Sequence, residues 1–76
     1  MEKNTLKEKL LKILSGYMDI DQVTGNEDES ILLDSMMFLE IIAVIESELD
    51  VTIFDEEIES MDSFNAMLDI ISSKVA

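Results

Sequence analysis

The sequence contains no cysteine, histidine, arginine, tryptophan or proline, and aromatic residues make up only 5% of its 76 residues. Without cysteine, the chain has neither a disulfide framework nor a thiolate zinc site. Without histidine or a thiol, it lacks the side chains that most often serve as general bases or covalent nucleophiles. We therefore expect a protein that is not an enzyme, although a hydrolase built on paired carboxylates remains an alternative.

Positive charge is also scarce, and the five basic residues all lie near the ends of the chain, at Lys3, Lys7, Lys9, Lys12 and Lys74. Between residues 13 and 73 there are 16 acidic residues and no basic one, and the formal net charge is −13. Such a field repels nucleic-acid phosphates and attracts basic patches on other proteins. We expect basic protein partners and no nucleic acid, while solubility alone is the simpler explanation of the charge.

Long apolar runs are absent, and none approaches the roughly 20 residues that a membrane-spanning helix needs. The first four residues lead directly into amphipathic sequence, without the apolar core of a signal peptide. We therefore expect a cytoplasmic monomer without a membrane span. The sequence shows neither an internal repeat nor a linker, so residues 1–76 are predicted to form a single domain.

The acidic stretch at residues 19–30 matches a calcium-binding loop only in its first two ligands, Asp19 and Asp21. The sixth position of such a loop requires glycine and is Thr24, and the twelfth requires a bidentate glutamate and is Ser30. We therefore predict no specific metal site, only diffuse binding of divalent ions to the acidic residues.

Apolar residues at helical spacing predict three main helices and one short one. Residues 5–8 have the spacing of a capping box, which predicts that the first helix begins near Leu6. Further helices are predicted at 34–49 and 55–60, with a last one that begins after the cap at 62–63. The expected fold is all-α, a small bundle of three main helices plus one short helix.

The predicted core comes from one face of each main helix and from the long loop at 18–34. The helical positions are Leu6, Leu10, Ile13, Leu14 and Tyr17, then Phe38, Leu39, Ile42, Ile45 and Leu49, and finally Phe64, Met67, Leu68, Ile71 and Val75. The loop positions are Ile20, Val23, Ile31, Leu32 and Leu33.

Asp-Ser pairs occur at two predicted helix starts, at residues 34–35 and 62–63. Both residue types are favoured helix caps, and capping alone explains the second pair. The first pair differs because it follows an apolar run and precedes the longest and most apolar helix. A serine in the first helical turn suits a phosphodiester, since unpaired backbone N–H groups and the positive end of the helix dipole favour an anion. Such an attachment could also bring a thiol to a chain that has none.

The first pair belongs to the motif Leu33-Asp34-Ser35-Met36, which is followed by Leu39-Glu40-Ile41-Ile42 and by Glu46-Ser47-Glu48-Leu49-Asp50. These segments resemble the acyl carrier proteins, whose second helix begins with Asp-Ser-Leu, continues with Glu-Leu and closes in a glutamate-rich stretch. The resemblance runs without a gap from residue 34 to about residue 71. It implies a helical bundle like that of the acyl carrier proteins.

The resemblance implies that a phosphopantetheinyl transferase attaches 4′-phosphopantetheine from coenzyme A to Ser35, with Asp34 and Met36 beside the arm. The thiol of the arm would carry acyl intermediates as thioesters between enzymes of fatty-acid, polyketide or related biosynthesis. These acyl-transferring and chain-extending enzymes would dock through basic patches. On this chain, the resemblance assigns docking to Glu40, Glu46, Glu48, Leu39, Ala43 and Ile53.

Several positions depart from the fatty-acid carriers. Leu32-Leu33 stand where a glycine often precedes Asp-Ser, which is more like D-alanyl carriers and the carriers of polyketide and nonribosomal peptide systems. Met37, Ser47 and Phe54 replace a frequent acid, a frequent glutamate and a frequent proline. A D-alanyl, aminoacyl or peptidyl carrier of the same fold is therefore an open alternative, as is an acidic interaction domain that is never modified.

Overall fold

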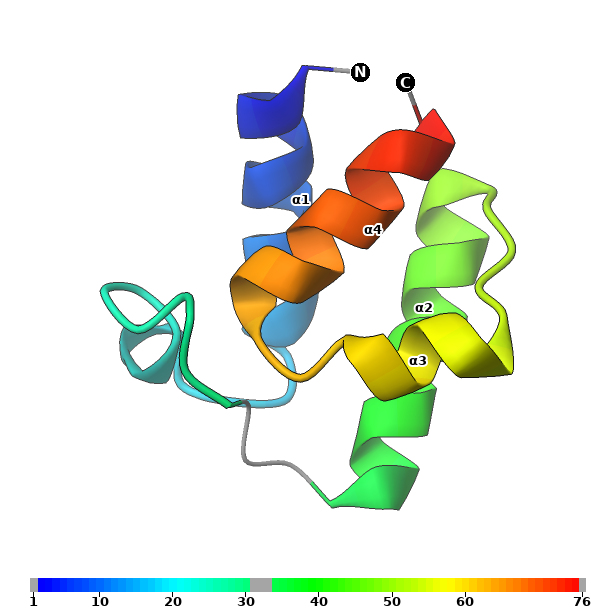
Figure 1. Cartoon of the computed structure of the whole chain (residues 1–76). Helices are drawn as coiled ribbons and strands as arrows, with labels where there is room; N and C mark the ends of the chain where they lie inside the picture. The colour runs from blue at the N-terminus through cyan, green and yellow to red at the C-terminus, as the bar shows by residue number, and fades with distance from the viewer. Residues whose placement is uncertain (1, 31–33, 76) are drawn as a thin grey trace.

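The computed structural model describes residues 2–30 and 34–75, in which the helices surround one apolar core (Figure 1). The main helices are α1 (Lys3–Leu14), α2 (Ser35–Leu49) and α4 (Phe64–Val75), with the short α3 (Asp55–Ser60) and a 3₁₀ turn, η1 (Ile20–Gln22). Within the described ranges, extended pairing is limited to one isolated bridge between Ser30 and Ser63. The predicted all-α bundle of three main helices and one short helix is confirmed.

In Figure 1, α4 crosses in front of α1, and α2 lies on the other side of the bundle. The short α3 lies across the middle of α2 and leads into α4. The start of α1 and the end of α4 lie at one end of the molecule, whereas the start of α2 lies at the opposite end. This arrangement separates the first turn of α2 from the ends of the chain.

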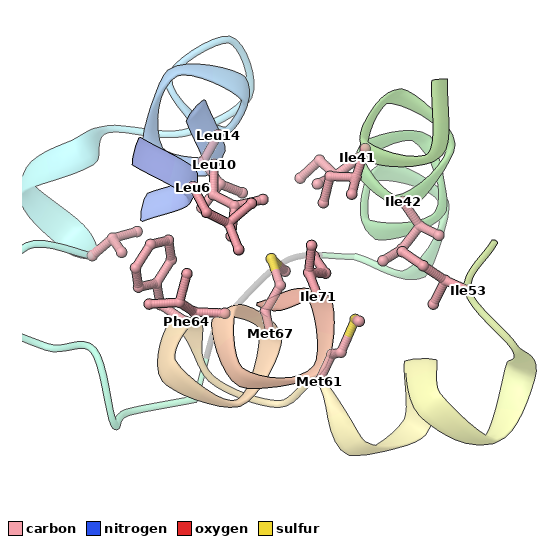
Figure 2. Close-up of a cluster of buried hydrophobic side chains, with 13 residues drawn as sticks. Leu6, Leu10, Leu14, Ile41, Ile42, Ile53, Met61, Phe64, Met67 and Ile71 are labelled. Carbon is pink, nitrogen blue, oxygen red and sulfur yellow. The ribbon is translucent and has the colours of Figure 1, made fainter. Parts of the chain in front are cut away.

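A cluster of 13 buried apolar side chains holds the helices together (Figure 2). Helices of this length are marginal alone in water, so their stability comes from packing these side chains, each contributing about 1.5–3 kcal/mol. The cluster consists of Leu6, Leu10, Leu14, Val23, Ile41, Ile42, Ile45, Ile53, Met61, Phe64, Met67, Leu68 and Ile71. The predicted core positions that are only half-buried are Ile13, Tyr17, Ile20, Phe38, Leu49 and Val75.

The predicted start of α1 is wrong, because the helix begins at Lys3 and Thr5 lies inside its first turn. Glu2 is the N-cap residue and makes no capping bond with its side chain. Its carbonyl accepts a hydrogen bond from the Leu6 N–H at 3.0 Å. The extra turn also brings Lys3 to Asp69 on α4, where the Nζ–Oδ1 distance is 2.9 Å, a tertiary contact that the local capping pattern does not indicate.

The second helix has the predicted bounds, but its buried stripe differs from the prediction. Ile41, Ile42 and Ile45 are buried, whereas Leu39 is 54% exposed. Ile41 lies three residues after Phe38 and four before Ile45 and extends the buried stripe, whereas Leu39 points outward although its spacing to Ile42 is also helical. This correction moves one large apolar side chain from the core to the surface.

The loop between α1 and α2 packs against the start of α4. Val23 is buried as predicted, and the predicted contacts of residues 31–33 lie outside the described residues. The Asn65 N–H donates to the Glu27 carbonyl at 2.9 Å, and its side-chain amide donates to Asp28 Oδ1 at 2.8 Å. These bonds fix the loop on α4.

Within residues 2–30 and 34–75, no helix is both long enough and apolar enough to cross a bilayer. No three acidic side chains of these ranges converge in a way that could hold a metal ion.

Candidate functional site

Ser35 is the first residue of α2, and its side chain is exposed. Asp34 precedes it as the N-cap residue, and Asp34 Oδ1 accepts a hydrogen bond from the Met37 N–H at 2.8 Å. The Asp34 carbonyl accepts a second bond, from the Phe38 N–H at 3.0 Å. Asp34 therefore fixes the start of the helix and leaves the Ser35 hydroxyl in solvent at the positive end of the helix dipole.

The same turn offers backbone donors to an anion. The N–H groups of Ser35 and Met36 have no acceptor among the described residues. Such groups at a helix N-terminus bind phosphate well. Beside them, the Met36 side chain is 76% exposed and provides apolar surface. These residues fit a phosphodiester on Ser35 that continues into an organic chain.

The second Asp-Ser pair is placed differently. Ser63 is only 8% exposed, and its Oγ accepts a hydrogen bond from the Ala66 N–H at 3.1 Å. This bond caps α4, as the sequence predicted for Ser63. Because the Ser63 hydroxyl is buried and bonded, it is a poor target for an enzyme, whereas the exposed Ser35 hydroxyl is a good one.

Residues four positions apart form continuous rows along a helix. Two adjacent rows make up the solvent-facing side of α2, which we call the outer face: Ser35, Leu39, Ala43 and Ser47, and Met36, Glu40, Val44 and Glu48. Val44 is half-buried and the other seven residues are exposed. The outer face brings the Ser35 site together with four of the residues predicted to dock, namely Leu39, Glu40, Ala43 and Glu48.

Glu46 and Ile53 lie apart from the outer face, so the six residues predicted to dock do not form one surface. Residues two positions apart are separated by about 160° around a helix, so Glu46 and Glu48 cannot share a face. Glu46 is half-buried, and its Oε2 accepts a hydrogen bond from the Ile53 N–H at 3.0 Å. Ile53 is 7% exposed and belongs to the core. Together they tie the connection after α2 back to the helix.

Glu57, Lys74 and Phe54 form a cluster that the sequence did not predict, although Lys74 stands out as the only base near the end of the chain. The Lys74 Nζ lies 2.8 Å from Glu57 Oε1 and 5.1 Å from the centroid of the exposed Phe54 ring. The same Glu57 oxygen accepts a hydrogen bond from the Phe54 N–H at 2.9 Å. The hydrogen bond from Lys74, and then that from Phe54, hold the pKa of Glu57 below its ordinary value. The cluster fixes the start of α3 against the last turn of α4.

The chain is similar to known proteins over nearly its whole length and theirs. The acyl carrier protein of Buchnera aphidicola subsp. Acyrthosiphon pisum (strain 5A) is 32% identical over 73 residues, which cover 91% of each chain. That of Buchnera aphidicola subsp. Schizaphis graminum (strain Sg) is 29% identical over 75 residues, 93% of this chain and 95% of the relative. No family model matches the chain.

The chain is a small helical bundle with an exposed serine at the first position of its second main helix. The similarity to curated relatives makes the assignment specific: the chain belongs to the acyl carrier protein family.

Proposed function

We propose that the protein carries acyl groups on a 4′-phosphopantetheine arm attached to the Ser35 hydroxyl, and that it is not itself a catalyst. The observation that supports this most strongly is the exposed Ser35 at the first position of α2, with Asp34 bound into the cap. When attached, the arm supplies the terminal thiol that a chain without cysteine lacks.

Loading joins the Ser35 oxygen to the pantetheine-bearing phosphorus of coenzyme A and releases adenosine 3′,5′-bisphosphate. The hydroxyl proton passes to a base of the transferase, because this chain has no histidine and the Asp34 carboxylate is engaged with the Met37 N–H. Asp34 thus positions the turn, and the backbone N–H groups of Ser35 and Met36 favour the phosphodiester charge.

The outer face of α2 is the proposed docking surface for the transferase and for the enzymes that load and consume the acyl group. Glu40 and Glu48 attract basic patches, while Leu39 and Ala43 provide apolar contact beside Ser35. Glu46 and Ile53 support this surface by fixing the connection that follows α2. We expect these encounters to take place in the cytoplasm, with the carrier as a monomer.

The cargo is proposed to be an acyl intermediate of fatty-acid, polyketide or related biosynthesis. The relatives at 29% and 32% identity are named acyl carrier proteins, which favours this cargo over D-alanine or a peptidyl group. The rival interaction domain would need no exposed serine at the start of α2.

Intact-mass measurement after incubation with a broad-specificity phosphopantetheinyl transferase tests the proposal. With coenzyme A, the protein should gain the mass of one phosphopantetheine. With an acyl-coenzyme A, it should gain that of the acylated arm, and neutral hydroxylamine should remove the acyl group. An unchanged mass, under conditions that load a known carrier protein, would support the unmodified interaction domain instead.

A further inference from the structure

Lys9 and Lys12 differ from the other three lysines of the chain. A carboxylate oxygen lies 2.9 Å from the Nζ of Lys3, 4.0 Å from that of Lys7 and 2.8 Å from that of Lys74. Among the described residues, no carboxylate comes within 4.0 Å of Lys9 or Lys12, and both side chains are exposed. In a chain of net charge −13, these two lysines are therefore positive charges that no described carboxylate offsets at ion-pair distance.

These two lysines border a groove of about 480 Å³ between α1 and α2. They lie three positions apart on α1 and therefore on the same side of that helix. The apolar lining comes from Ile13, Val44 and Leu49, and Glu48 lies on the α2 side. The groove thus offers an apolar surface with positive charge along one edge.

The groove adjoins the outer face of α2, because Val44 and Glu48 belong to both. Ser35 and Glu48 are about 20 Å apart along the helix axis. A standard interface covers about 800 Å² of each partner, a patch roughly 30 Å across. An enzyme that covers Ser35 and Glu40 can therefore reach Glu48, which lines the groove together with Lys9 and Lys12.

We propose that Lys9 and Lys12 orient the carrier on the phosphopantetheinyl transferase by meeting a carboxylate at the border of its basic patch. This inference rests on the proposed function and adds the chemistry of the partner. An acidic surface attracts a basic enzyme without selecting one orientation. A positive edge favours the orientation in which the two lysines meet a carboxylate over the orientations that place them against the basic patch. The apolar lining of the groove suits an apolar side chain beside that carboxylate.

The test compares two double variants with the same change in net charge. Lys9→Glu/Lys12→Glu reverses the edge of the groove, and Lys3→Glu/Lys7→Glu is the matched control, since these lysines pair with Asp69 and Glu27 instead. The kcat/KM for loading by the transferase should fall about tenfold in the first variant relative to the control, as expected when two exposed ion pairs become repulsive. Long-range attraction alone predicts equal loading of both variants, at least as fast as that of the wild type.

Loading of Lys9→Glu/Lys12→Glu at the rate of the control would overturn the inference. Helical circular dichroism verifies that both variants fold. Should the reversed pair not fold, the neutral pair Lys9→Gln/Lys12→Gln replaces it, with a loss of about threefold expected against Lys3→Gln/Lys7→Gln. A wild-type protein that accepts no arm would overturn the proposed function. If the wild type is loaded but replacing Lys9 and Lys12 does not slow loading relative to the control, only this inference is overturned.

Discussion

Glu40 and Glu46 carry the same charge on the same helix, yet their surroundings differ, and we propose a docking role only for Glu40. Glu40 is exposed in the outer face of α2, where it can meet a basic partner. Glu46 is half-buried, and its carboxylate accepts the Ile53 N–H. Charge alone therefore does not identify a docking residue, and the contact that each carboxylate makes inside the molecule separates the two roles.

Glu40→Lys should slow loading by the transferase and flatten its salt dependence, while the free energy of unfolding stays nearly unchanged.

Glu46→Ala should lower the free energy of unfolding by about 1 kcal/mol, because it leaves the Ile53 N–H without its partner. Glu46→Gln is the matched control, since it keeps an acceptor oxygen and loses the charge. Urea unfolding and loading kinetics measure both effects. Equal losses of stability in Glu46→Ala and Glu40→Ala would contradict this division.

The cluster of Glu57, Lys74 and Phe54 predicts a pH-dependent contribution to stability. Lys74 and the Phe54 N–H lower the pKa of Glu57 from 4.5, so its stabilising effect is fully present above that pH and is lost as the pH falls through the lowered value. The difference in unfolding free energy between wild type and Glu57→Gln should therefore shrink below about pH 4.5. Chemical denaturation across this range measures the difference. A difference that stays constant would show that Glu57 keeps an ordinary pKa.

At the scale of the helix, α2 ends in a strained residue. Asp50, its C-cap residue, has φ 54° and ψ 51°, in the left-handed region that favours glycine. It also places a negative charge at the negative end of the helix dipole. The end of α2 is therefore a site where stability can be gained without altering Ser35 at the other end.

Asp50→Gly should raise the free energy of unfolding by about 1 kcal/mol, since glycine adopts this conformation without a Cβ clash. Asp50→Ala is the control, because it removes the charge and keeps the Cβ. Thermal or urea unfolding of the three proteins separates the two causes. A gain in Asp50→Ala as large as that in Asp50→Gly would assign the effect to charge and not to backbone conformation.

The helices themselves were largely predictable, because their signals are local. The spacing of apolar residues and the acids at 55–57 gave α2 and α3 their correct bounds. Leu39 and Ile41 are both apolar, so periodicity alone could not decide which one faces α1 and α4. The Ser35 site was predicted from its motif, whereas the partners of Glu46 and Lys74 are set by tertiary packing and left no pattern in the sequence.

At the scale of the whole molecule, acidic charge is crowded onto a small surface. The runs 27–29 and 55–59 place acids close together, and each run has one lysine partner, Lys7 beside Glu27 and Lys74 beside Glu57. Unfolding spreads these charges apart, so their repulsion favours the unfolded chain. No group of three acids in the described residues forms a metal site.

Salt and divalent cations should therefore raise the melting temperature. Mg²⁺ or Ca²⁺ should act at far lower concentration than NaCl, because these ions bind between carboxylates as well as screening them. Circular dichroism melts from low salt to about 10 mM Mg²⁺, above the affinity of weak sites, measure the effect. A flat melting temperature would mean that the helices already hold the acids far enough apart for water to screen them.

The proposed carrier role depends above all on the Ser35 hydroxyl group, and the two Asp-Ser pairs of the chain provide an internal comparison. Ser35 is exposed at the start of α2, and Ser63 is buried as the cap of α4. Intact mass after treatment with coenzyme A and transferase should show one added phosphopantetheine in Ser63→Ala, as in the wild type, and none in Ser35→Ala. Loading of Ser35→Ala, or its loss in a folded Ser63→Ala, would contradict the assignment of the arm to Ser35.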